Sequence, residues 1–155
     1  QKVYIMKKLR IIFAALALIA GTSAFANPGV LVNEAVKKAF VKNFSSALHV
    51  NWEKKDVFYF ANFEMGEHVV TVAYDEDGQM LGMSRTISLT QVPLHVVQSV
   101  KDEYKGYRIA TTVSEILFNG ETNYYINVEG KSSIIKLRCD ANGQITEEKK
   151  ARLKI

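Results

Sequence analysis

The sequence predicts an α+β fold built as a tandem repeat, in which each half supplies one helix and about four antiparallel strands. Three observations support this prediction: two segments have apolar residues at helical spacing, short extended runs are separated by turn residues, and the second half matches the first at a nearly constant offset. We expect one continuous antiparallel sheet with both helices on one face, because a helix with a single apolar stripe covers a sheet.

The first 26 residues are predicted to be an upstream extension and a secretory signal peptide, not part of the fold. Met6 begins a basic segment, residues 11–20 are apolar, and Ala24-Phe25-Ala26 has the small-x-small form of a cleavage site. An apolar run of about ten residues is too short to span a bilayer. We therefore expect cleavage after Ala26, a periplasmic or secreted location and no stable membrane anchor afterwards; a retained anchor is the alternative.

The charge balance changes once this segment is removed. It holds four of the 20 basic residues and none of the 16 acidic residues, so residues 27–155 are formally neutral. Nucleic-acid binding requires a basic stripe, so no nucleic-acid partner is expected. A single cysteine excludes an internal disulfide framework.

Residues 27–155 are predicted to form a single domain, with repeats at about 30–90 and 91–155. Removing 26 of 155 residues leaves 129, enough for one ordinary core. Two independent domains are the weaker alternative, because about 60 residues are marginal for a core of their own and no flexible linker separates the halves.

Each half begins with a segment of helical periodicity. Asn33 is a plausible N-cap for the first helix, and Pro93 suits the first helical position of the second. We expect both apolar stripes to face the core. The predicted stripes are Val32, Ala35, Val36, Ala39, Phe40 and Phe44 in the first helix, and Val96, Val97, Val100 and Tyr104 in the second.

Strand signals follow each helix, with breaks rich in glycine, asparagine and aspartate that indicate an antiparallel meander. The predicted strands are about 49–53, 57–64, 68–75 and 79–88, then 108–118, 122–129, 132–139 and 144–153. Tyr74 matches Cys139 and Gly78 matches Gly143 at an offset of 65, whereas the helices match at an offset of 60. The second half therefore has about five extra residues, within KGYRIATT.

The acidic stretch YDEDGQ and its counterpart CDANGQ have two interpretations, a turn or a metal site. Asp-Gly and Asn-Gly between strands predict hairpins, and Asp75 and Asp140 can accept hydrogen bonds from backbone N–H groups two residues on. A calcium loop of the EF-hand kind needs glutamate at its twelfth position, where Thr86 stands. We predict turns and no metal site, with weak adventitious cation binding as the alternative.

The sequence does not decide the length of the loop after Tyr74. A two-residue loop would place Leu81 on the face of Tyr74, whereas a three-residue loop with a bulge would place Met80 there, and a slip of one residue exchanges the faces. Trp52, in VNWEKK, is predicted to belong to the core.

Residue types that carry catalysis are sparse. His49, His68 and His95 form no metal-binding pattern, and the sequence has no nucleophile elbow and no phosphate-binding glycine loop. Cys139 shares its strand parity with apolar residues and is predicted to be buried. We expect no catalytic residues, no metal, no cofactor and no enzymatic activity; a hydrolase site assembled from residues far apart in sequence is an alternative.

Aromatic residues occupy both faces of the predicted strand 57–64. The face of Tyr59 and Phe63 is taken as inward. The opposite face would expose Phe58, Phe60 and Tyr125, which are the candidate protein-binding residues, because a large aromatic patch on an open sheet marks an interaction site. The alternative is that the sheet curls or a loop covers these rings. The other inward residues are Val70, Val72, Tyr74, Ile135, Leu137 and Cys139.

The assembled segments resemble the PepSY-like, β-lactamase-inhibitor-like (BLIP-like) small periplasmic proteins of Bacteroidetes. The resemblance rests on AFVKNF, VNWEK and YFANFEMGEHVVTVAYDEDGQML, then on VPLHVVQSVKDEY, VSEILFNGETNYYINVEG and IIKLRCDANGQI, and covers nearly all of residues 27–155. It implies tandem helix-plus-sheet repeats, no catalytic residues and a binding or inhibitory role. No contact residues can be carried over, because none matches a defined motif.

The expected function is that of an exported, non-enzymatic binding module, an inhibitor or regulator of a secreted or periplasmic protein that it holds through the open sheet face. Such a protein would act by steric occlusion. The alternative is a protein that binds a small molecule or an envelope component in a pocket between sheet and helices or between the halves.

Overall fold

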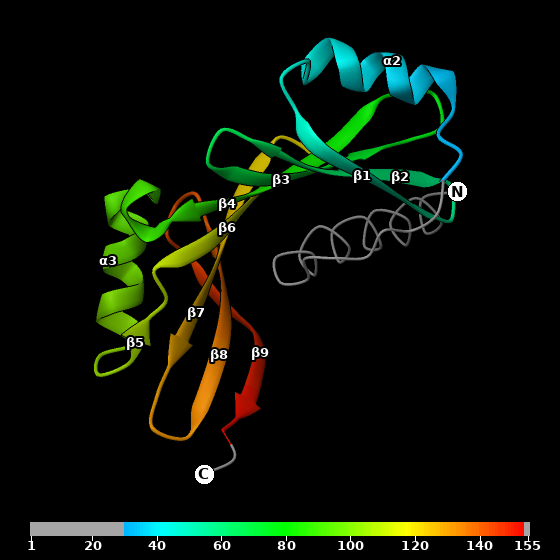
Figure 1. The fold of residues 1–155 in the computed structure, drawn as a ribbon. Helices are drawn as coiled ribbons and strands as arrows, with labels where there is room; N and C mark the ends of the chain where they lie inside the picture. The colour runs from blue at the N-terminus through cyan, green and yellow to red at the C-terminus, as the bar shows by residue number, and fades with distance from the viewer. Residues whose placement is uncertain (1–29, 154–155) are drawn as a thin grey trace. The chain divides into compact units, whose positions relative to one another are not determined.

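The computed structural model describes residues 30–153, which contain two α-helices, one short 3-10 helix and nine strands (Figure 1). The strands form an antiparallel sheet in the order β1-β2-β3-β4-β6-β7-β8-β9, and β5 pairs with β7. This confirms the predicted α+β class. The elements are α2 Glu34–Asn43, β1 Leu48–Lys55, β2 Phe58–Met65, β3 His68–Tyr74, β4 Met80–Ser88, η1 Leu89–Gln91, α3 Leu94–Glu103, β5 Arg108–Ile109, β6 Thr112–Phe118, β7 Glu121–Glu129, β8 Ser133–Asp140 and β9 Ile145–Arg152.

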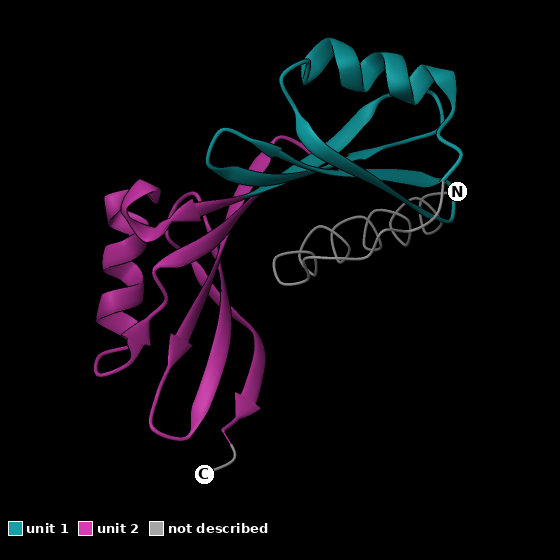
Figure 2. Ribbon diagram, viewed as in Figure 1, with its two compact units in different colours: residues 1–85 teal, residues 86–155 magenta. Residues whose placement is uncertain are grey.

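The described chain divides into two compact units, of which the first ends at Arg85 and the second begins at Thr86 (Figure 2). Each unit has one helix, one set of strands and one cluster of buried residues. The tandem repeat and the single domain over 27–155 stay predictions. The predicted signal peptide lies outside the described residues, and no helix within residues 30–153 has the length and apolar character to cross a membrane.

The core of unit 1 lies between α2 and one face of its strands. Asn33 caps the helix as predicted, since its Oδ1 accepts a hydrogen bond from the Val36 N–H at 2.9 Å. The Phe40 ring lies 5.2 Å from the Trp52 ring and 5.1 Å from the Phe63 ring, which confirms Trp52 as a core residue. The buried members are Val32, Val36, Phe40, Tyr59, Ala61, Phe63, Val70, Val72 and Tyr74.

The core of unit 2 is built in the same way from α3 and its strands. The helix begins at Leu94, so Pro93 is its N-cap and not its first residue; its ψ of 135° is extended and cannot belong to the first turn. The predicted inward faces are confirmed, because the buried cluster includes Val96, Val97, Val100, Tyr104, Tyr124, Ile126, Val128, Ile135, Leu137 and Cys139.

Both acidic stretches form the predicted turns. Asp75 Oδ1 accepts hydrogen bonds from the backbone N–H groups of Asp77 and Gln79 at 3.1 and 2.8 Å. In the second turn, Asp140 Oδ1 accepts hydrogen bonds from the N–H groups two and four residues on, at 2.8 and 2.9 Å. The carboxylates therefore hold the backbone of the turns.

Each turn also contacts the helix of its own unit. The Asn33 side chain donates a hydrogen bond to the Glu76 carbonyl at 2.7 Å, and His95 Nε2 lies 2.8 Å from the Ala141 carbonyl oxygen. Gly78, at φ +81°, comes so near to α2 that a Cβ there would lie 2.7 Å from the Ala35 carbonyl oxygen. Glycine meets both requirements at this position, the positive φ and the close approach.

The register after the first turn combines the two predicted alternatives. Tyr74 pairs with Met80, as expected for the longer loop, but a bulge follows and Ala73 pairs with Gly82. The bulge leaves Leu81 as the extra residue and returns Met83 to the helix-covered face, where it packs against the core of unit 1.

The predicted strand 108–118 is two strands, β5 and β6, which pair with the same edge of β7. At the break, the Ala110 N–H still donates to the Asn127 carbonyl at 2.9 Å, while the Thr111 carbonyl turns to accept a hydrogen bond from the Leu89 N–H at 2.8 Å. β5 and the bend that follows it lie within KGYRIATT, the segment in which the comparison of the two halves places the extra residues.

Candidate binding surface

The strands of unit 2 have one face covered by α3 and one face without a helix, called here the outer face of unit 2. Residues that pair across antiparallel strands project to the same side. Tyr125 pairs with Ser114 and with Arg138, and Asn127 pairs with Lys136. These residues alternate with the buried Ile126 and Leu137 and so define the outer face.

The three candidate protein-binding residues are not exposed. Phe58 and Phe60 in unit 1 are 6% and 0% exposed, and Tyr125 in unit 2 is 6% exposed. The expectation that these rings stand open to solvent is therefore wrong; their role in binding a protein stays a prediction. Long cationic side chains lie over two of the rings, since Lys55 Nζ is 5.7 Å from the Phe60 centroid and Lys136 Nζ is 5.1 Å from the Tyr125 centroid.

The outer face of unit 2 presents charged groups above these strands. Lys136 on β8 pairs directly with Lys149 on β9. Arg138 Nε lies 3.0 Å from Glu148 Oε1, and both side chains are 37% exposed. Burial lowers the pKa of Lys136, the Glu148 carboxylate raises it, and the nearby Lys149 ammonium lowers it further.

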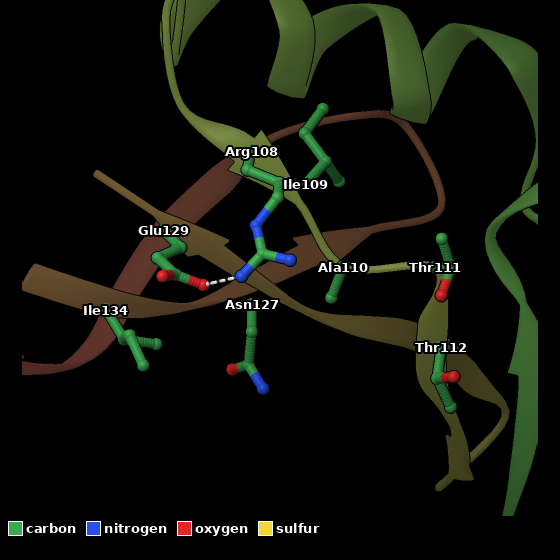
Figure 3. Close-up of a pocket in the computed structure, with 8 residues that line it drawn as sticks. All are labelled: Arg108, Ile109, Ala110, Thr111, Thr112, Asn127, Glu129 and Ile134. Atoms are coloured by element: carbon green, nitrogen blue, oxygen red, sulfur yellow. Dashed lines mark hydrogen bonds and ion pairs between the residues drawn. The ribbon is translucent and has the colours of Figure 1, made fainter. Parts of the chain in front are cut away.

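A hollow of about 450 Å³ lies on unit 2 where β5 gives way to β6 (Figure 3). Arg108 and Glu129 form an ion pair at its rim, and the exposed Thr112 and Asn127 supply a hydroxyl and an amide. Hydrogen-bonding groups beside apolar side chains are typical of ligand sites of this size. The lining residues are Arg108, Ile109, Ala110, Thr111, Thr112, Asn127, Glu129 and Ile134.

The sequence did not identify this hollow, although it held a signal for it. The insertion KGYRIATT of the second half contains Arg108 and the residues up to Thr112, which form one wall. The other wall is formed by β7 and β8. The pairing of β5 with β7 brings Asn127 and Glu129 opposite the insertion, and the pairing of β7 with β8 adds Ile134.

Two of the histidines, His49 and His95, make contacts within their own units. His49 Nδ1 contacts Glu64 Oε2 at 3.0 Å on the surface of unit 1, whereas His95 contacts a turn carbonyl of unit 2. Within residues 30–153, histidine, cysteine, aspartate and glutamate form no group of three that could hold a metal. Cys139 is fully buried, as predicted, and burial together with Asp140 and Glu103 raises the pKa of its thiol to about 11.

No protein-family model and no curated protein matches the chain. Its structure is similar to a BLIP-like protein from Bacteroides fragilis, with a TM-score of 0.67 and 20% identity over 83% of this chain and 92% of the other. A protein of the DUF2874 family from Bacteroides ovatus has a TM-score of 0.67 and 21% identity over 80% and 89% of the two chains.

A third similar structure, from Bacteroides eggerthii, is provisionally described as periplasmic; its TM-score is 0.67, with 16% identity over 79% of this chain and 90% of the other. At sequence identities this low, the structural similarity shows a shared fold, but a ligand or partner of these proteins cannot be assigned to this chain. The chain therefore has the fold of the BLIP-like and DUF2874 proteins of Bacteroides.

Proposed function

We infer that the protein is an exported, non-enzymatic binding module that holds another protein through the outer face of unit 2. The observation that carries this proposal is the hollow between β5, β6 and β7, because its exposed hydroxyl, amide and ion pair lie on the face that α3 leaves uncovered. Export is supported by the signal-peptide pattern of the first 26 residues.

Site-specific photo-crosslinking tests the binding face. A benzoylphenylalanine at Asn127 places the reactive group at the hollow, and the same residue at Gln98, on the exposed side of α3, is the matched control within unit 2. We expect a discrete crosslinked protein from position 127 in living cells and none from position 98. The same crosslinks from both positions, or none from 127, would contradict the proposal.

A second candidate function is the binding of a small molecule or an envelope component. The hollow favours it, because about 450 Å³ lies within the range of small-molecule sites. Native mass spectrometry of protein purified from its natural compartment tests this candidate. A bound mass that disappears in a Thr112→Tyr variant, which fills the hollow, would support a small ligand over a protein partner.

A further inference from the structure

The strand β5 has one paired edge and one open edge. Among the described strands it pairs with β7 alone, where Ile109 lies opposite Val128. The Ala110 N–H donates to the Asn127 carbonyl at 2.9 Å, so the backbone of Ala110 faces β7. Backbone groups of successive residues in an antiparallel strand point to opposite edges. The N–H and C=O of Ile109 therefore point away from β7, toward the open edge.

The backbone of Ile109 has no hydrogen-bond partner at this open edge within residues 30–153. Further along the same edge, the Thr111 carbonyl already accepts a hydrogen bond from the Leu89 N–H at 2.8 Å. The outer strands β1 and β9 also have open edges, but a bulge interrupts each of them and hinders the addition of a further strand. Ile109 thus offers one unpaired donor and one unpaired acceptor side by side.

The hollow follows this open edge. Five consecutive residues, 108–112, line it (Figure 3), although successive side chains of an extended segment project to opposite sides. The backbone of the segment is therefore part of the wall. A residue added opposite Ala110 would project to the same side as the Ala110 methyl group. That side holds the Asn127 amide and the Thr112 hydroxyl, and neither side chain has a hydrogen bond within the described residues.

The lining of the hollow selects an uncharged polar side chain. Arg108 and Glu129 form an ion pair, and the other lining residues are neutral. A charged group that entered would lose hydration without meeting an unpaired opposite charge. The Thr112 hydroxyl and the Asn127 amide offer both donors and acceptors, which suit a hydroxyl or an amide of the ligand.

We propose that the open edge of β5 binds an extended segment of a partner protein as an added strand, with an uncharged polar side chain of that segment in the hollow. This proposal rests on the proposed function and names the form of the partner's contact. The residue opposite Ile109 would exchange two backbone hydrogen bonds with it, as in other cases of strand addition. Since β5 has only two residues, the polar contacts in the hollow must supplement this pair of bonds.

Amide hydrogen exchange, followed by nuclear magnetic resonance, tests the added strand on the ¹⁵N-labelled protein. The probe is the peptide Thr-Ala-Thr-Ala-Thr, acetylated and amidated at its ends. At saturation we expect exchange of the Ile109 amide to slow at least fivefold. The Ala110 amide is the internal control, because it already donates to Asn127, and its exchange should change less than twofold. An Ile109 amide that is protected no more than Ala110 would overturn the proposal.

Backbone methylation of the probe tests which edge of the peptide is used. Ile109 packs against the core, so the peptide residue opposite it projects to the side of α3, where alanine fits, and the threonines project over the hollow. Methylation of the alanine nitrogens should weaken binding at least tenfold, and methylation of the threonine nitrogens less than threefold. Equal affinities of the two methylated forms would overturn the added strand.

The chemistry of the side chain is tested with the same probe. Glutamate or lysine in place of the central threonine should weaken binding at least threefold, and equal affinity of either charged peptide would refute the uncharged side chain. Maltose serves as a neutral small ligand. Shifts of the Thr112 and Asn127 amides with maltose, and none with the peptide, would overturn the proposal in favour of a small molecule.

Crosslinking distinguishes this proposal from the one on which it rests. Ile109→Pro removes the outward N–H without removing a bond to β7, and Ile109→Ala is the control for the lost side chain. The variants are compared once their thermal unfolding midpoints agree; the peptide tests depend on neither. We expect the Asn127 crosslink with alanine and not with proline.

A crosslink that persists with proline would leave the proposed function standing and refute the added strand. If no protein crosslinks from Asn127 in any background, the proposed function fails, and the partner named here fails with it.

Discussion

Replacing Gly78 by alanine tests how closely the first acidic turn packs on its helix. Gly78 has φ +81°, and a Cβ at this position would lie 2.7 Å from the Ala35 carbonyl oxygen and 2.9 Å from its carbonyl carbon. Both atoms belong to the backbone of α2, so relief requires the helix or the turn to move. Gly66 is the matched control, because it has φ +61° in the same unit and a Cβ there would meet nothing within 4 Å.

The two substitutions differ mainly in the helix contact. Each places a side chain in the left-handed region, which costs about 1–2 kcal/mol. Each also lowers the conformational entropy of the unfolded chain by replacing one glycine, and this effect is the same for both variants. Gly78→Ala alone adds the overlap with α2, worth about 1–3 kcal/mol by analogy with overpacked cores. The expected losses of unfolding free energy are therefore about 2–5 kcal/mol for Gly78→Ala and about 1–2 kcal/mol for Gly66→Ala.

Urea denaturation followed by tryptophan fluorescence measures this difference in unit 1. Trp52 is the only tryptophan of the chain and packs against Phe40 of α2, so its emission reports the unit that carries both glycines. Midpoints of Gly78→Ala and Gly66→Ala that agree within about 0.5 kcal/mol, after conversion with the measured m-value, would refute the close contact between turn and helix.

Three other predictions concern the two cores. On α2, Val36 is fully buried and Val41 is 62% exposed. Val36→Ala should therefore lower the free energy of unfolding by about 2–3 kcal/mol, and Val41→Ala by under about 0.5 kcal/mol. Trp52 fluorescence in urea measures both losses. Burial raises the pKa of Tyr74 to about 12, despite a smaller opposing effect of the Asn43 side chain. Because the folded state keeps a proton that the unfolded state loses near pH 10, the free energy of unfolding should fall between pH 10 and 12, by an amount on the order of 2–3 kcal/mol. A Tyr74→Phe variant that shows the same fall would contradict this. The pKa of the Cys139 thiol is raised to about 11, so only about one part in a thousand is thiolate at pH 8. The thiol should therefore react with an aromatic disulfide reagent only after the protein unfolds. Rapid reaction of the native protein would place Cys139 at the surface.

The inward faces were predictable because they depend on local periodicity. A period of two placed Tyr59 and Phe63 on one face, and the choice of that face as inward is confirmed, although Phe58 and Phe60 on the opposite face are buried too. Helical spacing identified Val36 and Phe40 as core residues, whereas Ala35 of the same predicted stripe is exposed. The acidic turns were also predictable, because aspartate and glycine act on backbone atoms within four residues of themselves.

The candidate binding surface depends on pairings between distant segments. Sequence periodicity placed Tyr125 on the outer face but could not show that Lys136, eleven residues further on, would cover its ring. Likewise, the hollow exists because β5 and β6 meet the same edge of β7, and the opposition of Lys136 to Lys149 exists because a bulge shifts the register of β9.

By itself, the sequence determined the fold class, the helix-covered faces and the chemistry of the turns, since these follow from interactions within a few residues of the chain. The tertiary structure decided which outward side chains are covered, where the hollow lies and which charges oppose each other. The physical reason is that register is a property of two strands together, and a shift of one residue changes every neighbour on a face.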